Sequence, residues 1–332
     1  MLLSWQPITL DLVRPFNIAH GVSLTRHNVF VRIESGLGEA AAVSYHHETQ
    51  AGIIEYLRSV ELSAIDDPFE LEDILAGLPK GSAAARAAID MALHDLWGQR
   101  LGQPLYRLLG LNPARSPETS YTIAIDTPEA MAQVAASCDQ PILKIKLGSE
   151  DDEARVRSVR QATKATIRVD ANGAWSRERA QGLLPVLHEF GVELVEQPLP
   201  VADLDGLREL MRLKSRPRIF ADESIRTASD ILAHVGLVDG IVVKLAKCGG
   251  IREAVRQITL ARALDMEVMI GCMIETSAAV TAAAHLAPLA QYADLDGPLL
   301  IQNDPVRGVQ YQGARLILPS GPGLGLTRRE LP

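Results

Sequence analysis

Short apolar runs rich in β-branched residues alternate with amphipathic helical stretches from Ser120 onward. Their starts recur about every 20 to 30 residues, the length of one strand and its following helix. The eight runs are Tyr121 to Ile125, Ile142 to Leu147, Ile167 to Asp170, Glu193 to Gln197, Arg218 to Asp222, Ile241 to Leu245, Glu267 to Gly271 and Tyr292 to Leu295. Eight such units close a parallel barrel, so the pattern predicts a TIM-type barrel of the α/β class.

The first part of the chain has a different pattern. Apolar and polar residues alternate from Ile8 to Leu12 and from Val29 to Ile33, which predicts two strands with a loop from Asn17 to Asn28 between them. Ser82 then precedes an Ala-rich helical stretch, Ala83 to Gln99, as a favourable N-cap. This part predicts a small α+β domain.

Three segments follow from these patterns. We expect the small domain to cover residues 1–115 and the barrel to cover residues 116–315. The tail, residues 316–332, contains a Gly- and Pro-rich stretch from Leu318 to Leu326. We expect this tail to leave the barrel and return to the small domain.

Composition narrows the class of protein. With 332 residues, 47% hydrophobic and 22% charged, the chain is typical of a globular protein. Its net charge of -8 argues against a nucleic-acid partner, and no apolar stretch approaches the roughly 18 to 20 residues that span a bilayer. The cysteines, Cys138, Cys248 and Cys272, lack zinc-site spacing and fit a reducing compartment, so we expect a cytoplasmic protein.

Ionisable residues occupy the ends of the predicted barrel strands, where TIM barrels carry their catalytic groups. They are Lys144 and Lys146 on the second strand, Asp170 on the third, Glu196 on the fourth, Asp222 on the fifth, Lys244 on the sixth, and Asp294 and Asp296 on the eighth. These residues lie inside apolar runs, where an unpaired charge is costly to bury. We therefore expect them to compensate one another.

Three acids on adjacent strands predict a metal site. Asp170, Glu196 and Asp222 offer hard oxygen ligands suited to Mg²⁺, and no His or Cys accompanies them as zinc would favour. The alternative is that each acid caps the following helix or bonds a loop.

The lysines are placed for proton transfer. Lys144 and Lys146 are two residues apart and project to the same strand face, while Lys244 comes from the opposite wall. A lysine near a bound cation and inside apolar walls has its pKa lowered toward the range of a general base. Two facing lysines would address the two faces of one carbon. The alternative is that they serve only as ion-pair partners of the acids.

In its motifs the sequence resembles the enolase superfamily, and within it the muconate-lactonizing subgroup. The matching motifs are LKIKLG, DAN at Asp170 to Asn172, EQP at Glu196 to Pro198, DES at Asp222 to Ser224, KLAKCGG at Lys244 to Gly250, the helix Ala87 to Gly110 and PGLGL at Pro322 to Leu326. The resemblance implies a modified TIM barrel of the (β/α)7β type, with an α+β capping domain built from the N-terminal segment and the tail.

The resemblance also implies a mechanism. Mg²⁺ held by the three acids binds a substrate carboxylate, Lys146 or Lys244 takes the α-proton, and the opposite lysine returns it. Lys144 stabilises the enediolate. Asn172 and Glu223 would orient ligands or lysines, or serve only in structural bonding.

A second acid pair indicates the substrate. Asp294 and Asp296, in YADLDGPLL, share one strand face and would bind a cation. They resemble the DxD motif with which dipeptide epimerases hold the substrate α-ammonium, and GCMIET, with Met273 and Glu275, resembles the segment before it. We therefore expect a dipeptide of the L-Ala-Xaa type, although Asp296-Gly297 is also typical of a simple turn.

By the same resemblance, the segments Asn17 to Arg26 and Ser44 to Glu48 cover the mouth and contact the distal side chain. His20, Gly21 and Tyr45 are candidate substrate-binding residues there, with Arg26, His46 and His47 as further candidates. Members selective for Ala-Glu carry an arginine about five residues after a Pro-Phe pair, a position that Gly21 occupies here. This departure argues against a glutamate preference.

Other functions remain open on this sequence. The same fold supports an N-acylamino-acid racemase, an o-succinylbenzoate synthase or a muconate-type cycloisomerase, against which only the acid pair argues. Lys244 could instead form a Schiff base in a metal-independent aldolase, and Gly249-Gly250 gives only weak support for phosphate binding.

We expect a small-molecule substrate, no nucleic acid or membrane partner, and a homo-oligomer.

Overall fold

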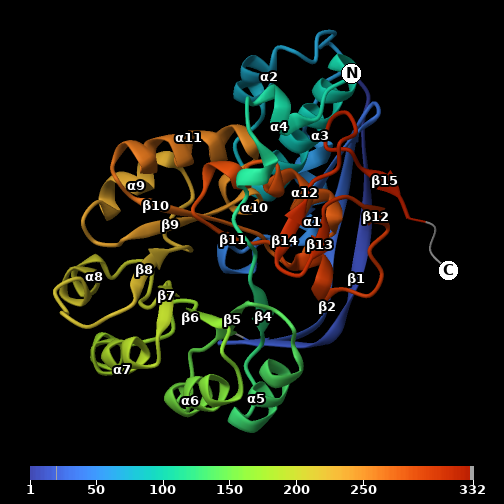
Figure 1. The fold of residues 1–332 in the computed structure, drawn as a ribbon. Coiled ribbons are helices and arrows are strands. Elements are labelled where there is room, and N and C mark those ends of the chain that lie inside the picture. Colours follow the sequence, from blue (N-terminus) through green and yellow to red (C-terminus); the bar gives the residue numbers. More distant parts are fainter. Residues whose placement is uncertain (20, 330–332) are drawn as a thin grey trace.

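An eight-stranded parallel sheet forms the centre of the computed structural model, which describes residues 1–19 and 21–329 (Figure 1). In chain order its strands are β4 (Tyr121–Ile123), β5 (Ile142–Lys146), β6 (Thr166–Asp170), β7 (Val192–Glu196), β8 (Arg218–Ala221), β9 (Gly240–Lys244), β10 (Glu267–Gly271) and β11 (Tyr292–Asp294). The last strand returns to the first, because the Ser120 amide donates to the Ala293 carbonyl at 3.2 Å. Each of the eight predicted runs overlaps one strand to within one or two residues, so the predicted barrel is confirmed.

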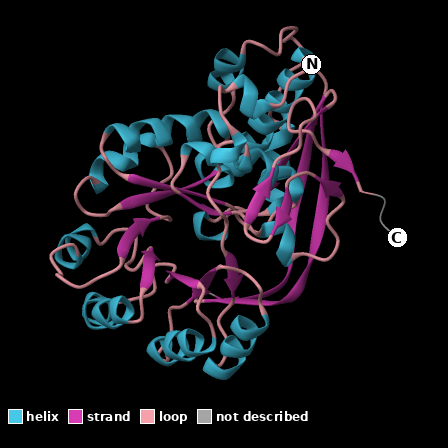
Figure 2. Ribbon diagram, viewed as in Figure 1, coloured by secondary structure: helices cyan, strands magenta, loops and turns pink. Residues whose placement is uncertain are grey.

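Helices cover the outside of the barrel (Figure 2). They are α5 (Pro128–Ser137), α6 (Asp152–Ala162), α7 (Arg177–Glu189), α8 (Leu204–Leu210), α9 (Ala228–His234), α10 (Leu245–Cys248), α11 (Ile251–Ala263) and α12 (Ser277–Ala284). Short 3-10 turns lie at Ser44–His46, Pro113–Arg115, Ala287–Leu289 and Gly297–Leu300. Apolar faces of the helices and the outward side chains of the strands form one continuous core.

The barrel interior is divided into an apolar and a charged layer. Leu194, Phe220, Val242 and Met269 form a buried cluster, with Tyr292 packed against it. Because side chains alternate along each strand, the inward residues two positions later are Glu196, Asp222, Lys244 and Asp294 at the carboxyl ends, while β10 has Gly271 there. The apolar layer therefore closes the charged site from below.

The N-terminal part forms an antiparallel sheet of β1 (Leu3–Ile18), β2 (Gly21–Ile33) and β3 (Gly36–Ala41). The helices beside it are α1 (Gln50–Arg58), α2 (Leu71–Gly77), α3 (Ala83–Leu101) and α4 (Leu105–Leu108). Ser82 caps α3 as predicted, its hydroxyl accepting from the Ala85 amide at 3.1 Å. We call this sheet with its helices the capping domain.

The predicted loop from Asn17 to Asn28 is wrong. β1 and β2 stay paired almost to the tip, with Ile18 opposite Gly21, and form a long hairpin that reaches β4 (Figure 1). This distal half lies outside the capping-domain core, so it does not show the apolar alternation that marks a half-buried strand.

Strand β3 was also missed by the pattern. Glycines replace side chains in it: a Cβ on Gly38 would lie 2.0 Å from the Ala88 carbonyl oxygen of α3. The backbone of β3 therefore packs directly on α3, and the glycines on that face of the strand carry little periodic signal.

The C-terminal tail contacts the capping domain. Gly323 accepts from the Leu105 amide at 2.8 Å and donates to the Gln103 carbonyl at 2.9 Å, while the Leu324 amide donates to Asp95 at 2.7 Å. Strand β12 (Val306–Arg307) pairs with β15 (Thr327–Arg328), and β13 (Gln310–Gln312) pairs with β14 (Arg315–Ile317). Within the described residues, no helix has the length and apolar character needed to cross a membrane.

Candidate active site

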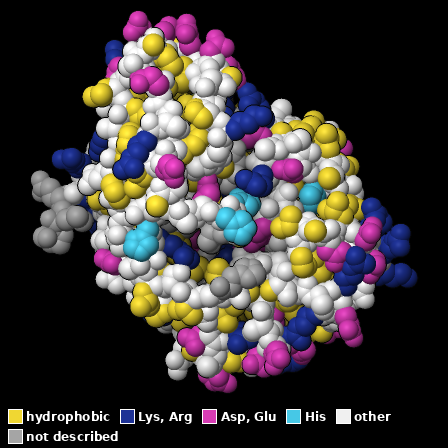
Figure 3. Space-filling model, turned by 180° about the vertical axis from the view of Figure 1, so that it is seen from behind, with side chains coloured by type: hydrophobic (Ala, Val, Ile, Leu, Met, Phe, Trp, Pro, Cys, Tyr) yellow, Lys and Arg dark blue, Asp and Glu magenta, His cyan; other side chains and the backbone are white. Residues whose placement is uncertain are grey.

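A cavity of about 480 Å³ lies between the carboxyl ends of the barrel strands and the capping domain. We call its barrel side the floor, formed by Lys144, Lys146, Asn172, Glu223, Lys244, Asp294 and Asp296. We call its capping side the roof, formed by Phe16, Ile18, Arg26, Asn28, Ala41, Ala42 and Tyr45. In the space-filling view the surface is hollowed between the two parts of the molecule, with basic side chains and histidines nearby (Figure 3).

Lys144 joins three carboxylates on the floor. Its Nζ lies 2.7 Å from Glu196, 2.8 Å from Asp294 and 3.0 Å from Asp170. Burial disfavours its charge, but the three carboxylates outweigh burial and raise the pKa of Lys144 well above its ordinary value. Lys144 is therefore a fixed positive charge at the centre of the site.

Lys146 and Lys244 face each other across the floor. Their strands, β5 and β9, are separated by three strands in either direction around the barrel. The Nζ of Lys146 lies 2.6 Å from Asp170, and the Nζ of Lys244 lies 2.5 Å from Asp222. The two amines thus belong to opposite walls, as the strand order predicted.

The predicted lowering of the lysine pKa concerned a lysine beside a bound cation, and with the side chains alone the pKa of Lys144 and Lys244 is raised instead. Burial favours the neutral amine of Lys244, but Asp222 and Glu196 raise its pKa well above the ordinary value. The expectation considered a neighbouring cation and apolar walls, and gave too little weight to carboxylates within hydrogen-bond distance.

The three acids predicted as metal ligands lie directly below the lysines. Asp170, Glu196 and Asp222 are fully buried, and their ends are drawn together by shared ammonium groups. Within the described part of the chain, no three His, Cys, Asp or Glu side chains are arranged to hold a metal ion as they stand. However, three buried carboxylates that already share cations have the oxygen chemistry that Mg²⁺ requires, so the donor set fits this ion.

The pKa values of these three acids depend on the charged groups next to them. Burial opposes ionisation, yet Lys144 and Lys146 lower the pKa of Asp170 well below its ordinary value. Burial and the charge of Asp170 raise the pKa of Glu196. Three carboxylates in one place are thus compensated by lysines, and Glu196 binds a proton most readily.

Several side chains orient the acids and lysines from behind. The Nζ of the fully buried Lys247 lies 2.6 Å from Asp222, and the Gln197 side-chain carbonyl accepts from the Asp222 amide at 2.9 Å. Asn172 accepts from Lys146 at 3.4 Å and donates to Glu223 at 3.0 Å. Asn172 and Gln197 both have positive φ, 45° and 39°, so the backbone is strained at the ends of β6 and β7.

Asp294 and Asp296 form the acidic end of the floor. Ser120 donates to Asp294 at 2.6 Å, and the Thr122 amide donates to Asp296 at 2.6 Å. Burial and the charge of Asp294 raise the pKa of Asp296 to about 7, whereas Lys144 and Ser120 outweigh burial and lower the pKa of Asp294. The pair offers a negatively charged site for a cation.

Some of the remaining predicted residues line the cavity and others do not. Tyr45 and Met273 line the cavity, and the Tyr45 hydroxyl lies 4.0 Å from the Met273 sulfur. Glu275 turns away from the cavity and accepts from the Met273 amide at 3.0 Å; burial raises its pKa to about 8. Gly21 is an exposed residue at the hairpin tip, and His20 lies outside the described residues.

Sequence reasoning missed Ser120, Thr122, Gln197 and the role of Lys247. Ser120 and Thr122 meet the acid pair only because β4 closes on β11, a contact between residues about 174 positions apart. Gln197 could have been identified from the sequence, since it belongs to the EQP motif at the end of β7.

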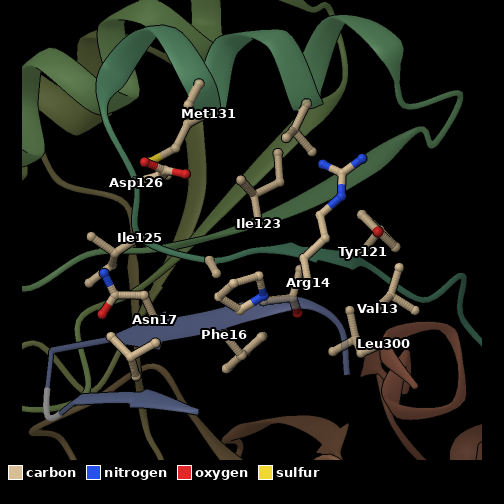
Figure 4. Close-up of a pocket in the computed structure, with 16 residues that line it drawn as sticks. Val13, Arg14, Phe16, Asn17, Tyr121, Ile123, Ile125, Asp126, Met131 and Leu300 are labelled. Carbon is tan, nitrogen blue, oxygen red and sulfur yellow. The ribbon is translucent and has the colours of Figure 1, made fainter. Parts of the chain in front are cut away.

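A second cavity of about 330 Å³ adjoins the first (Figure 4). It lies between β1, β4 and α5, and it shares Phe16, Thr122 and Leu300 with the first cavity. Its walls are mostly apolar, with Arg14 and Asp126 as its charged residues among those described. It contains none of the strand-end lysines, so the proton-transfer groups belong to the first cavity alone.

Two family models together cover most of the chain. Residues 127–331 match the model described as enolase C-terminal domain-like. Residues 7–110 match the N-terminal domain of mandelate racemase / muconate lactonizing enzyme.

Individual relatives match over nearly the whole length. The chain is 40% identical to an L-Ala-D/L-Glu epimerase of Bacteroides thetaiotaomicron, over 99% of this chain and 88% of that protein. It is 38% identical to a hydrophobic dipeptide epimerase of Enterococcus faecalis, over 96% of each. Its structure is similar to a dipeptide epimerase of Cytophaga hutchinsonii complexed with Mg and D-Ala-L-Val, with a TM-score of 0.92, 29% identity and coverage of 99% and 97%. The names agree on the reaction and differ in the side chains.

Proposed function

This chain belongs to the enolase superfamily, and from that premise we propose that it is a Mg²⁺-dependent epimerase of dipeptides. The observation that carries the proposal is the distribution of charge within one cavity. Lys146 and Lys244 lie on opposite walls of the barrel, and Asp294 and Asp296 add an acidic pair at the end of β11. A molecule with a carboxylate at one end and an ammonium at the other matches this arrangement.

The floor residues would hold the dipeptide by both ends. Asp170, Glu196 and Asp222 would hold Mg²⁺. When bound there, the ion supplies positive charge beside the substrate carboxylate and competes with the lysine ammonium groups for the same oxygens. Asp294 and Asp296 bind the α-ammonium by charge-assisted hydrogen bonds.

Proton transfer is assigned to the two facing lysines. The α-carbon next to the substrate carboxylate lies between Lys146 and Lys244, so one amine removes its proton and the other delivers a proton to the opposite face. Lys144 places a fixed positive charge where the enediolate develops negative charge. Asn172, bonded to both Lys146 and Glu223, orients the first base.

The acid pair is what favours a dipeptide over the alternatives on the same fold. An N-acylamino acid, a succinylbenzoate precursor or a muconate has no ammonium group, and would leave Asp296 buried without a cation. We also propose that the enzyme works in the cytoplasm as a homo-oligomer. The three cysteines, all free, are consistent with a reducing compartment.

Deuterium incorporation tests the reaction. The protein is incubated with Mg²⁺ in D₂O, once with a mixed L,L-dipeptide library and once with N-acylamino acids, and mass spectrometry follows each compound. We expect a gain of one mass unit together with the appearance of the epimer on chiral chromatography. Deuterium in an N-acylamino acid, with none in any dipeptide, would contradict the dipeptide assignment and leave the proton-transfer chemistry in place.

A further inference from the structure

A third cavity, of about 610 Å³, lies at the edge of the capping domain, on the side where the tail strands β12 and β15 lie (Figure 1). Its walls come from the three strands of the capping sheet, from α3, and from residues 305–306 and 326–329 of the tail. Within the described part of the chain it shares no lining residue with either of the other two cavities. We call it the tail cavity.

The register of the capping sheet builds one wall of the tail cavity. Val29 and Val31 of β2 pack into the core of the capping domain, so Phe30 and Arg32 between and after them face the opposite way. Leu37 of β3 lies opposite Arg32 and lines the same cavity. This is the face of β2 that carries roof residues of the active-site cavity nearer the hairpin tip. One face of the sheet therefore serves two separate cavities.

The bottom of the tail cavity is apolar. Phe30, Leu37 and Val306 belong to one buried cluster with Ala278 of α12, and Leu326 of the tail packs against it. The capping sheet, the barrel and the tail thus meet beneath this cavity. A ligand with an apolar group is favoured here, because it covers apolar surface that otherwise contacts water.

Three arginines surround the tail cavity without anionic partners. Arg32 comes from β2, and Arg328 and Arg329 come from the tail. Within residues 1–19 and 21–329, none of the three guanidinium groups has an ion pair or a side-chain hydrogen bond. Asp95 is the one carboxylate among the described lining residues, and it already accepts from backbone amides of β3 and of the tail at 3.0 and 2.7 Å. Three positive charges and one negative charge leave a net charge of +2 here, in a chain of net charge -8.

The geometry points to the tail cavity as a binding site for a small organic phosphate, in which a phosphate monoester is attached to an apolar group. A phosphate monoester carries a charge of about -1.5 to -2 near pH 7 and three oxygens that accept strong hydrogen bonds. Its charge matches the net charge of the cavity, and guanidinium groups bind such oxygens by paired hydrogen bonds. A monoanion would compensate only half of that charge. The site is independent of the proposed epimerase function.

A ligand in the tail cavity would join two distant parts of the chain. Arg32 belongs to the capping sheet, whereas Arg328 and Arg329 lie at the end of the tail, where β15 is paired with β12 over only two residues. A phosphate bound to all three guanidinium groups fastens the tail to the sheet. Because such a ligand binds only the folded protein, it should raise the temperature of thermal denaturation.

Calorimetry with phenyl phosphate as the probe tests the site, in the presence of Mg²⁺. Phenyl sulfate has nearly the same shape but one negative charge, and inorganic phosphate lacks the apolar group. We expect phenyl phosphate to bind at least about 10-fold more tightly than either of them and to raise the denaturation temperature by a few degrees.

Matched variants locate the bound phosphate. Arg32→Met, and the double variant Arg328→Met with Arg329→Met, should each weaken the binding of phenyl phosphate about 10-fold or more. Arg32→Lys keeps the charge and should retain part of the affinity. Arg307→Met is the control, because Arg307 is an exposed arginine of β12 that does not line the cavity. Arg26→Met removes a cation of the active-site cavity instead. Both controls should change the affinity less than about 3-fold.

Four results would overturn the assignment. They are the absence of phenyl phosphate binding at millimolar concentration, equal affinity for phenyl sulfate, an equal loss in Arg307→Met and Arg32→Met, and a loss in Arg26→Met with none in Arg32→Met. The last result would place the phosphate in the active-site cavity. Circular dichroism of each variant without ligand confirms that it is folded, so that a loss of affinity reports on the missing guanidinium.

Discussion

The floor and the roof of the cavity differ in how their charged side chains are paired. On the floor, every lysine is within hydrogen-bond distance of an acid, and the ligating groups come from rigid parallel strands of one barrel. On the roof, a long hairpin supplies mostly apolar surface and one cation, Arg26, which has no carboxylate within ion-pair distance among the described residues.

This difference separates reaction from substrate choice. Charges that compensate one another can be held ready in a buried site, and they are suited to a step that every substrate shares. A single uncompensated charge in apolar surroundings favours only a substrate that brings the opposite charge. The relatives agree with this division, since their names share epimerisation and differ in the dipeptide side chains.

Removal of divalent metal should give the largest effect, because it acts on the whole floor. Treatment with EDTA should reduce deuterium exchange at the α-carbon to background, and added Mg²⁺ should restore it. The barrel strands do not depend on the ion, so the far-UV circular dichroism spectrum should stay unchanged. Full exchange after exhaustive chelation would contradict the metal-site assignment.

Replacement of the two proposed bases should have the next largest effect on the reaction. Lys146→Ala and Lys244→Ala should each lower the rate of epimerisation by roughly 10²- to 10⁴-fold, since each removes one of the two groups that handle the proton. The rate is followed by chiral chromatography. Lys164→Ala, at an exposed lysine beyond α6, is the control and should behave like the natural protein. Near-normal turnover by either floor variant would exclude the two-base mechanism.

A smaller effect is expected at the acidic end. Asp296→Asn should lower kcat/KM for dipeptides about 10- to 100-fold, because a charged hydrogen bond to the α-ammonium is lost. With a pKa of about 7, Asp296 is protonated below neutrality, so kcat/KM of the natural protein should rise with pH through about 7. This limb of the pH profile should be absent in Asp296→Asn. An unchanged profile would show that another group titrates there.

The smallest effect concerns stability and compares the two domains directly. Gly38→Ala places a methyl group against the α3 backbone and should lower the free energy of unfolding by about 1–3 kcal/mol. Gly182→Ala, at an exposed position of α7 where a Cβ meets nothing within 4 Å, should raise it by up to about 1 kcal/mol. Thermal denaturation measures both. Equal effects would mean that the close packing of β3 on α3 is not a constraint.

The sequence predicted the floor well and the roof poorly, for a physical reason. Strand-end residues such as Asp170 and Lys244 follow β-branched runs of fixed length, so local pattern places them at the carboxyl edge of the barrel. The roof depends on contacts that no local pattern contains. The register that turns Arg26 into the cavity and the backbone contact at Gly38 are set by pairing between distant segments.

The pKa shifts also show what the sequence alone cannot predict. That lysines and acids would compensate one another could be predicted, but the sign of the shift at Lys244 could not. It depends on an oxygen of Asp222 at 2.5 Å, a distance that follows from the folded structure and from no spacing in the chain.

The contact of the tail with α3 has a consequence for biosynthesis. Asp95 accepts hydrogen bonds from Leu37 on one side and from Leu324 on the other, so the capping domain uses both ends of the chain. During translation the roof segment leaves the ribosome first, yet its last partners emerge only after the complete barrel. The barrel can therefore close before the capping domain has all of its contacts, and the segment around Gly323 and Leu324 completes that domain.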